Sequence, residues 1–592
     1  MSGAMDRYLL FPVLVPLALV AAGNDAFGFD PPGWLDTFMY VGYFWHYPEH
    51  LPLFDDYYKI SRLPWILPGF AAHSLGGVIV GSLVLAYLTM AAGAVALYLL
   101  VRDTLEDRTI AAVIGVAWAC CTWVHGIGGW SYHVLAAGAY YLMACWLIVR
   151  AARGPSPVLS ATMAGACFAS AVHTHLFLVT FTPLLAVLYW TALPAVDRPF
   201  ARGARAALLA LAGGLVLTLA LAVVNRGTGG AWLFFMPQIE QAMSLSSGRD
   251  RWWVGMTAQW LSSARYLVMP LALMAAGLAV PLVSRGDRRG RLPLVLVGLA
   301  WAALAIMCFF QFVQRQTTLD YSYMAFVIYL HAFPCAAAAL AVRQDRGGQG
   351  ERPLLTVGIA TTVILGTLVL LLPTPLPGFM NRVSTLLGLG QFALIVAPLV
   401  ISLVGVVAMQ LMRGPARLIM FAIWFAVVNA WIAPSPTAYG IGTPGIGRQM
   451  MTLFREADRL TTELDPTLLG IKYWISNDQI TTAQGVVPLG AVFDSYVATR
   501  TWLPNLLGRR SPGLPIEQLT VAHVERGVCI GVLSSIETQA RLRLEMEAHF
   551  AALGRPLRLV AARQFERSGL SFALTVLKPS SGPDAGQPPC AP

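Results

Sequence analysis

Long apolar stretches recur along the first three-quarters of this 592-residue chain and restrict its fold more than any other feature. A helix needs about 20 mostly apolar residues to cross a bilayer, and its backbone must satisfy its own hydrogen bonds there. Hydrophobic residues make up 57% of the chain and charged residues 12%, and the mean hydropathy is +0.64. The sequence therefore predicts a polytopic α-helical membrane protein with about 13 transmembrane helices. The expected spans lie near residues 8–23, 73–101, 109–125, 133–150, 158–172, 176–193, 206–224, 265–284, 292–312, 322–342, 353–373, 389–412 and 417–433.

Two of these regions allow a second interpretation. The stretch 158–193 is interrupted by the polar VHTHLF, so it holds either two short helices or one helix and a re-entrant segment. The first apolar run, from Tyr8 to about Ala22, precedes small residues that would also suit signal-peptide cleavage. We interpret it as a retained span, because cleavage would separate the acidic segment that follows from the membrane.

Arginines in alternate short loops predict the orientation of the spans. Loops rich in Lys and Arg stay on the cytoplasmic side, so the amino terminus is expected inside, and both loop 24–72 and the segment after Pro434 outside. The net charge of +10 is then explained by topology, and we expect no nucleic-acid partner. The arginines concerned are Arg150, Arg153, Arg198, Arg202, Arg205, Arg285, Arg288, Arg289, Arg291, Arg343, Arg346, Arg352, Arg413 and Arg417.

Arginine far outnumbers lysine, which occurs only at Lys59, Lys472 and Lys578. This imbalance is common in proteins of GC-rich bacterial genomes. With the predicted spans, it indicates a multi-pass protein of the bacterial inner (plasma) membrane.

The composition changes after residue 433 to that of a soluble domain. Short apolar strands such as VCIGVLS and FALTVLK alternate with amphipathic segments GRQMMTLFREADRLTTEL and IETQARLRLEMEAHFAAL, a pattern typical of a small α/β domain. We therefore divide the chain into a transmembrane catalytic domain at 1–433, an extracytoplasmic α/β domain at 434–578 and a disordered tail at 579–592.

The eight cysteines show neither metal-ligand nor disulfide-framework spacing. Six of them fall in or beside apolar stretches, so they are expected to be embedded in the membrane. The sequence predicts no structural disulfide.

The segment from Asn24 to His73 combines six carboxylates, one lysine and one arginine with many aromatic residues, next to the membrane. Asp36, in GWLDTFMY, would be ionised at neutral pH and can take a proton from a hydroxyl nucleophile. The alternative is an interfacial acid that starts a helix. Asp55 and Asp56 form a second acidic pair, which could orient an acceptor, bind a divalent metal or form solvated ion pairs.

Basic and aromatic residues on the same predicted face complete the candidate site. Lys59 and Arg62 follow the acidic pair and can hold a phosphate, lysine as a point charge and arginine as a bidentate fork. His133 can donate to a phosphate or a sugar hydroxyl. Arg249, Arg251 and Arg315 are external despite the positive-inside pattern, which either a lipid phosphate or nearby acids would explain. We add Tyr57, Tyr58 and Trp130 as substrate-binding candidates.

The chain resembles the GT-C superfamily of integral-membrane glycosyltransferases, which includes protein O-mannosyltransferases, the aminoarabinose transferase of lipid A and mycobacterial arabinosyltransferases. The resemblance lies in a first span followed by a long external loop, in WLDTFMY, in DDYYKISRLPWILPG before the second span, and in a multispan body ending in an external domain. The resemblance to this superfamily is weaker in the carboxy-terminal domain, where it lies in IKYWISNDQ and VFDSYVATRTWL.

This resemblance implies inverting transfer of a sugar from a polyprenyl-phosphate donor to an envelope glycan, lipid or protein acceptor. It implies an acid of the first external loop as general base, and Asp36 matches best. The adjacent Asp-Glu pair of many relatives is missing, so Asp25 and Asp30 stay as alternatives. No cofactor is required, and a divalent metal at Asp55 and Asp56 is the weaker alternative. Membrane lipids are the remaining expected partners.

Three other functions compete with this interpretation. A transporter or lipid flippase would need ionisable groups in mid-span and preferably a repeat, for which His331 and Gln311 offer little support. A scaffold has no use for carboxylates held beside a bilayer. An O-antigen-ligase-like enzyme would place its long external loop late among the spans.

Overall fold

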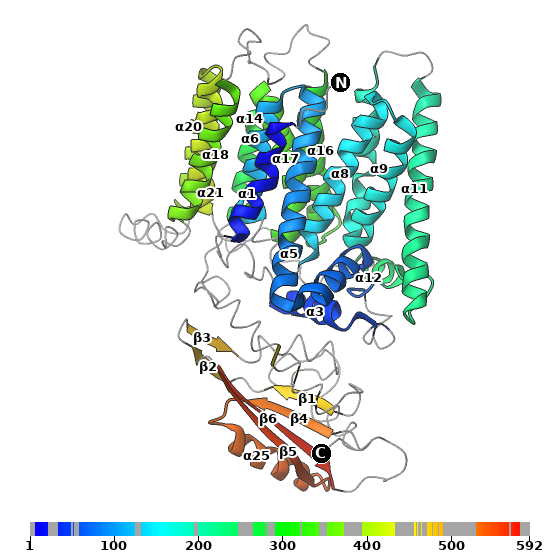
Figure 1. The fold of residues 1–592 in the computed structure, drawn as a ribbon, viewed down its shortest axis with the longest axis vertical. Helices are drawn as coiled ribbons and strands as arrows, with labels where there is room; N and C mark the ends of the chain where they lie inside the picture. The colour runs from blue at the N-terminus through cyan, green and yellow to red at the C-terminus, as the bar shows by residue number, and fades with distance from the viewer. Residues whose placement is uncertain are drawn as a thin grey trace. The chain divides into compact units, whose positions relative to one another are not determined.

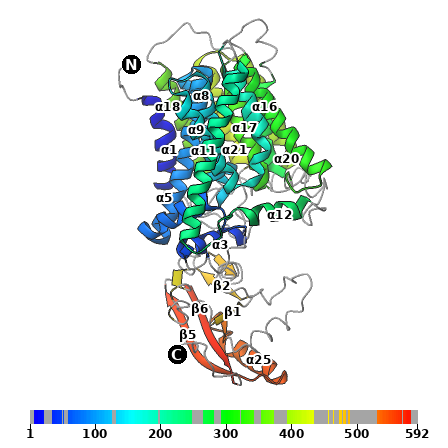
Figure 2. The ribbon, with the colours of Figure 1, turned by 90° about the vertical axis from the view of Figure 1, so that its right-hand side faces the viewer.

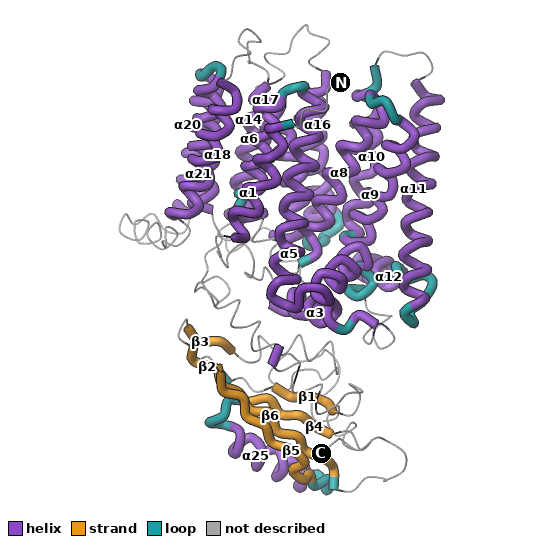
Figure 3. Tube along the Cα trace, in the orientation of Figure 1, coloured by secondary structure: helices purple, strands orange, loops and turns teal. Residues whose placement is uncertain are grey.

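The computed structural model shows a predominantly helical chain with a small sheet near its carboxy terminus (Figure 3). It describes residues 6–21, 34–48, 58–124, 132–194, 199–246, 264–278, 291–319, 322–341, 352–371, 393–432, 471–475, 478–482, 485–488, 529–567 and 570–580, with 51, 280, 455, 456, 459 and 463. Two compact units are present. The first comprises Met1–Gly28, Phe54–Pro68 and Leu83–Ser435, and the second Phe29–Leu53, Gly69–Ser82 and Pro436–Pro592.

Helices form the first unit, and one of them, α5 (Leu63–Leu105), also contributes to the second. Short 3-10 helices η1 (Arg7–Leu9), η2 (Leu176–Phe181) and η3 (Ala264–Leu267) and the π-helix η5 (Phe309–Val313) adjoin them. The other helices are α1 (Leu10–Ala21), α6 (Arg108–Ala119), α8 (His133–Arg153), α9 (Pro157–Thr174), α10 (Thr182–Ala192), α11 (Pro199–Gly227), α12 (Met236–Ser246), α14 (Val268–Gly277), α16 (Arg291–Cys308), α17 (Ser322–Ala341), α18 (Arg352–Leu371), α20 (Ala393–Leu411) and α21 (Pro415–Ile432).

Five helical segments of the described part are long and apolar enough to cross a membrane. Shorter apolar helices occupy most of the other predicted spans. The predicted class, a multi-pass helical protein with a small carboxy-terminal sheet, is confirmed at this level, while the number of spans and their orientation stay predictions. The five segments are Leu63–Leu105, His133–Arg153, Pro199–Gly227, Arg291–Val313 and Met324–Ala341.

Helix α5 begins at Leu63 and ends at Leu105, so it contains the predicted second span, 73–101, and extends beyond both of its ends. Pro64 lies in the first turn, where the missing N–H is not needed and the fixed φ suits a helix. The helix is interrupted at Gly77, whose φ of 66° and ψ of −177° are not helical. A residue without Cβ adopts this conformation readily.

The segment 158–193 contains two α-helices, α9 and α10, joined by η2. Helix α9 ends at Thr174, since His175 leaves the helical region with φ −147° and ψ 94°, and η2 then leads into α10. Helix α9 packs between α8 and α11, and the three run side by side (Figure 1). A Cβ at Gly165 would collide with the carbonyl oxygen of Ala210, so glycine permits close backbone approach between α9 and α11.

The amino-terminal segment contacts later helices through a hydrogen bond, an ion pair and helix packing. Asp6 caps η1 by accepting from the Tyr8 amide at 3.3 Å. Its other carboxylate oxygen accepts from the Tyr98 hydroxyl at 2.7 Å and lies 3.4 Å from Arg102 Nη1, both on α5. Helix α1, dark blue in Figure 2, also packs on α6. The first apolar run is therefore an integral part of the helical unit.

A side-chain amide organises the turn between α16 and α17. Gln311 is fully buried in η5, and its Oε1 accepts from the backbone amides of Thr318 at 2.9 Å and Leu319 at 2.8 Å. The Thr318 hydroxyl donates to the Met307 carbonyl at 2.9 Å. The described residues after η5, up to Leu319, are thus held by the Gln311 side chain.

The second unit contains helix α3 (Trp34–Trp45) and residues 69–82 of α5. The ring centroids of Phe44 and His73 are 5.1 Å apart, and those of Tyr47 and Phe70 are 6.1 Å apart. His73 is buried, with Nδ1 2.8 Å from the Gly69 carbonyl and Nε2 3.1 Å from Ser82 Oγ. Part of the predicted external loop is therefore helical and packed through aromatic side chains.

The remainder of the second unit includes a four-stranded sheet in the order β1-β4-β6-β5, in which β1 and β4 are parallel and the other pairs antiparallel. Helix α25 packs through Phe550 against Ile530, Val532, Leu557 and Leu577. The predicted strands at 528–534 and 572–578 and the predicted helix at 536–553 are confirmed, whereas most of 447–464 lies outside the described residues. The elements are β1 (Ile471–Ile475), β2 (Gln479–Thr482), β3 (Gly485–Pro488), β4 (Cys529–Ser534), α25 (Gln539–Ala552), β5 (Leu557–Arg567) and β6 (Leu570–Pro579); β2 and β3 form a separate antiparallel pair.

Cys529 in β4 is buried and disulfide-bonded, so the prediction of no structural disulfide is wrong. Spacing could not reveal this bond, because a single bridge needs no local cysteine pattern. The cysteines of the helical unit agree with the prediction and are free thiols: Cys120, Cys121, Cys145, Cys167, Cys308 and Cys335.

Candidate active site

A turn directly before α5 brings two predicted phosphate-binding cations to one tyrosine ring. Lys59 Nζ lies 5.7 Å and the Arg62 guanidinium carbon 5.2 Å from the centroid of the Tyr58 ring. Ser61 Oγ donates to the Tyr58 carbonyl at 2.8 Å and so closes the turn. Lys59 is 5% exposed and Arg62 is half-buried, which places positive charge where water screens it weakly.

The Arg62 guanidinium contacts His133, the first residue of α8. Arg62 Nη1 lies 2.9 Å from Nδ1 and 2.8 Å from Nε2 of that ring, so it can donate to whichever nitrogen carries no proton. The Tyr140 hydroxyl, about two turns further along α8, donates to the Pro64 carbonyl at 3.0 Å. Two contacts therefore hold the start of α5 against α8.

His175 adds a second imidazole to this cluster. It follows the last residue of α9, and its ring lies edge-on to His133 with centroids 5.5 Å apart and an interplanar angle of 81°. Burial, and secondarily the positive charge of Arg62, lowers the pKa of His175 to about 3. The ring is therefore neutral at physiological pH.

Helix α12 connects the turn before α5 to the end of α9. Gln238 Nε2 donates to Ser61 Oγ at 3.0 Å and lies 3.0 Å from the His173 carbonyl oxygen. The His173 ring points elsewhere, with Nε2 2.9 Å from Thr218 Oγ1 on α11. His173 and His175 thus face different partners. We refer to Tyr58, Lys59, Arg62, His133 and His175 as the cationic cluster.

The structure brings together four residues predicted for the site, Tyr58, Lys59, Arg62 and His133. Arg315 is exposed and has a φ of 54°, at the turn that follows η5. Asp36 lies in α3 of the second unit, with its side chain outside the described part. The remaining predicted residues lie outside the described residues: Asp25, Asp30, Asp55, Asp56, Tyr57, Trp130, Arg249 and Arg251.

Sequence reasoning missed Ser61, Gln238 and the role of His175 in the cluster. The only sequence evidence for a role of His175 was the polar segment VHTHLF, which interrupts an apolar stretch. That segment does not show which partner each histidine contacts. The side chains of the cluster are cationic or neutral hydrogen-bond donors, a combination suited to an anion. Within the described ranges, His, Cys, Asp and Glu form no group of three that could hold a metal.

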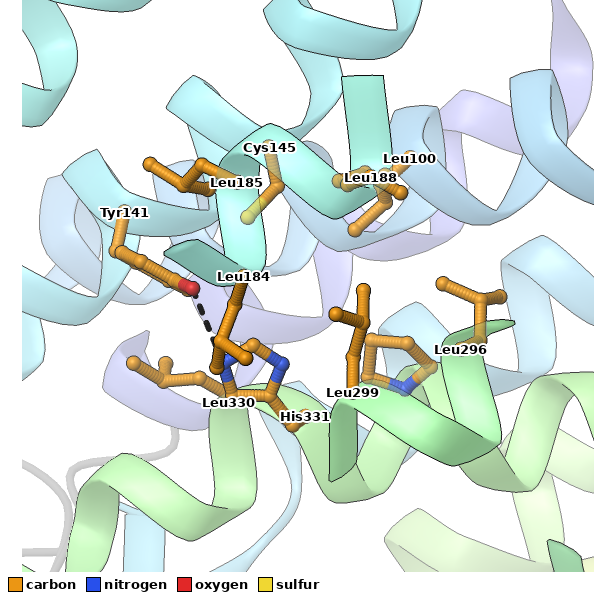
Figure 4. Close-up of a pocket in the computed structure, with 11 residues that line it drawn as sticks. Leu100, Tyr141, Cys145, Leu184, Leu185, Leu188, Leu296, Leu299, Leu330 and His331 are labelled. Carbon is orange, nitrogen blue, oxygen red and sulfur yellow. Dashed lines mark hydrogen bonds between the residues drawn. The ribbon is translucent and has the colours of Figure 1, made fainter. Parts of the chain in front are cut away.

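A separate small cavity lies deeper in the helical unit (Figure 4). Its volume is about 10 Å³, near the lower limit for one water molecule, and its lining is mostly leucine. His331 Nε2 and the Tyr141 hydroxyl are 3.0 Å apart at its wall. The two polar groups of the lining therefore contact each other, and we assign no ligand to this cavity.

Comparison with known proteins finds no family model and no curated sequence that matches the chain. Among solved structures, ArnT from Cupriavidus metallidurans bound to undecaprenyl phosphate is 13% identical, with a TM-score of 0.48 and coverage of 97% of this chain and 98% of that chain. The apo state of the same protein gives a TM-score of 0.47 at 13% identity and the same coverage. Because both TM-scores are below 0.5, the proposals below depend on the residues of this chain.

Proposed function

We propose that the protein is a membrane glycosyltransferase of GT-C type. It moves a sugar, with inversion, from a polyprenyl-phosphate donor to an envelope glycan, lipid or protein acceptor on the external face of a bacterial inner membrane. The observation that carries this proposal is the contact of Arg62 with His133 beside Lys59. It gathers cationic and donor groups from two distant segments of the chain at one place.

Such a cluster can stabilise the negative charge of a phosphate leaving group. As the bond between the anomeric carbon and the phosphate oxygen breaks, the phosphate leaves with the electron pair and gains negative charge. Preorganised cations and hydrogen-bond donors stabilise this developing charge. Arg62 offers a planar fork, Lys59 a point charge, and the first turn of α8 the positive end of a helix dipole.

The acceptor side of the reaction is assigned to Asp36. Its carboxylate takes the proton of the acceptor hydroxyl while the acceptor oxygen bonds to the anomeric carbon. Attack from the face opposite to the departing phosphate inverts the configuration. This role follows from the position of Asp36 in the first external loop of a chain that resembles the GT-C superfamily, and helix α3 supplies a defined backbone for it.

A transfer assay tests the proposal. Purified protein in detergent is incubated with a panel of radiolabelled polyprenyl-phosphate sugars and extracted envelope acceptors, and labelled product is measured for the wild type, Asp36→Asn and Arg62→Gln. We expect transfer with at least one donor and its loss in both variants. Arg153→Gln is the control, because Arg153 donates to the Ala192 carbonyl at 2.8 Å on a different loop. Absence of both transfer and donor binding in the wild type would contradict the proposal, and full activity of folded Asp36→Asn would remove its assigned role.

A further inference from the structure

We propose that His175 is a further binding residue of the phosphate site and that its Nε2–H donates a hydrogen bond to a phosphate oxygen. This inference depends on the proposed function, since it assigns the phosphate to the same cationic cluster. It adds a neutral donor from the break between α9 and η2, a segment that the sequence did not connect with the site.

The first support is an unused polar atom. His175 is 6% exposed, and its Nε2 is buried without a hydrogen-bond partner among the described residues. Buried side-chain nitrogens nearly always have a partner, either in the protein or in a ligand or bound water. The ring therefore offers one hydrogen bond that the surrounding fold does not use.

The second support is the charge of the surroundings. The titratable and charged groups that face or influence His175 are the guanidinium of Arg62 and the neighbouring ring of His133, with Lys59 in the same turn as Arg62. His173, two residues earlier, turns its ring to Thr218. Positive neighbours disfavour a second proton on the imidazole and favour an anionic oxygen as the partner of a neutral N–H.

The third support is that the local fold does not need a histidine at this position. The backbone amide of His175 donates to the Ala171 carbonyl at 2.8 Å, and its carbonyl accepts from the Leu178 amide at 3.0 Å. Its ring otherwise packs against the rings of His133 and Phe177, with centroids 5.5 Å and 6.4 Å away. An apolar ring would satisfy the same packing, so the nitrogen is available for a ligand.

The test is a binding experiment with the full-length protein in mixed micelles. The probes are a polyprenyl phosphate, the corresponding polyprenol without phosphate, and inorganic phosphate. The variants are His175→Phe, which keeps a ring but no donor, and His175→Gln, whose amide nitrogen can replace Nε2. Because a hydrogen bond to a charged group is lost, we expect His175→Phe to weaken polyprenyl-phosphate binding about tenfold or more, and His175→Gln to restore most of it.

The outcomes separate this inference from the proposed function. A loss with both phosphate probes assigns the contact to the phosphate group itself, and a loss with the lipid probe alone assigns it to a lipid-borne phosphate. Unchanged affinity of folded His175→Phe for both probes overturns the inference, while failure of Arg62→Gln to alter binding would contradict the proposed site as a whole. His173→Phe is the matched control and should bind like the wild type. If His175→Phe does not fold, His175→Leu is compared with His175→Gln in the same assay.

Discussion

Arg62 Nη1 lies 2.8 Å from Nε2 of His133, although the two residues are 71 positions apart in the chain. The contact joins the turn before α5 to the first residue of α8. It also places the positive charge of Arg62 beside the positive end of the α8 dipole. An anion bound there offsets the repulsion between these two like charges. This relationship is the centre of the proposed phosphate site.

Two substitutions of Arg62 should distinguish what its positive charge contributes to sugar transfer from what the planar shape of the guanidinium contributes. We expect Arg62→Gln to lower kcat/KM for sugar transfer by about 100-fold, because a donor to the developing phosphate charge is lost. Arg62→Lys should fall between this variant and the wild type, since lysine keeps the charge but not the planar fork. Steady-state transfer kinetics at several donor concentrations measure both values. Equal kcat/KM for Arg62→Lys and Arg62→Gln would show that charge at this position is unimportant.

The stability of the protein should fall as the pH decreases below about 6.5. The pKa of His175 is lowered from about 6.5 in the unfolded chain to about 3 in the folded protein. At a pH between these two pKa values, the unfolded chain therefore binds a proton that the folded chain does not. From pH 6.5 to pH 5 this costs about 2 kcal/mol of folding free energy. His175→Gln should remove that share of the pH dependence in thermal or denaturant unfolding. Replacement of the exposed His549 by Gln is the control, and an unchanged slope in His175→Gln would contradict the buried, neutral state of this ring.

Asp6 should stabilise the amino-terminal end of the helical unit. Asp6→Asn keeps a side-chain oxygen for the Tyr8 amide but removes the charge opposite Arg102, so we expect a loss of about 1–2 kcal/mol. Thermal unfolding in detergent measures it. In the control, Glu545→Gln removes a carboxylate from an exposed helical ion pair with Arg541 at 3.9 Å and should change the stability by less than about 0.5 kcal/mol. Similar losses in both variants would exclude a special contribution from Asp6.

Cys529 should resist alkylation in the denatured protein until a reductant is added. A persistent disulfide is typical of an oxidising compartment, so its presence in protein isolated from cells would also support an external carboxy-terminal domain. Cys529→Ser should destabilise this domain by about 2–4 kcal/mol. Mass spectrometry with and without reduction, with the free thiol Cys335 as the internal control, tests the bond. Complete labelling of Cys529 before reduction would contradict it.

Much of the architecture could be predicted because it depends on local patterns. Apolar length located the helices, and the short strands around Cys529 and Phe572 followed from their β-branched and apolar runs. The meeting of Lys59 and Arg62 with His133 was predictable from topology, since the loops that contain them were assigned to one face. Their roles in catalysis stay predictions.

Other features depend on packing that no local pattern encodes. The predicted loop 24–72 included Pro64 and Pro68, yet the first turns of α5 accommodate both prolines. His175 joins the cluster because the chain leaves the helical conformation at that residue, and Gln238 reaches Ser61 from a helix 177 positions away. Both are properties of the assembled helices.

The buried amide of Gln311 has a consequence for how the sequence between α16 and α17 can vary. A single side-chain oxygen of η5 accepts from two successive backbone amides further along the connection, so one side chain fixes the position of both amides. Backbone N–H groups are common to all residues except proline. Provided that Gln311 is kept, these two hydrogen bonds therefore survive any substitution at positions 318 and 319 except proline, and the two helices keep this link.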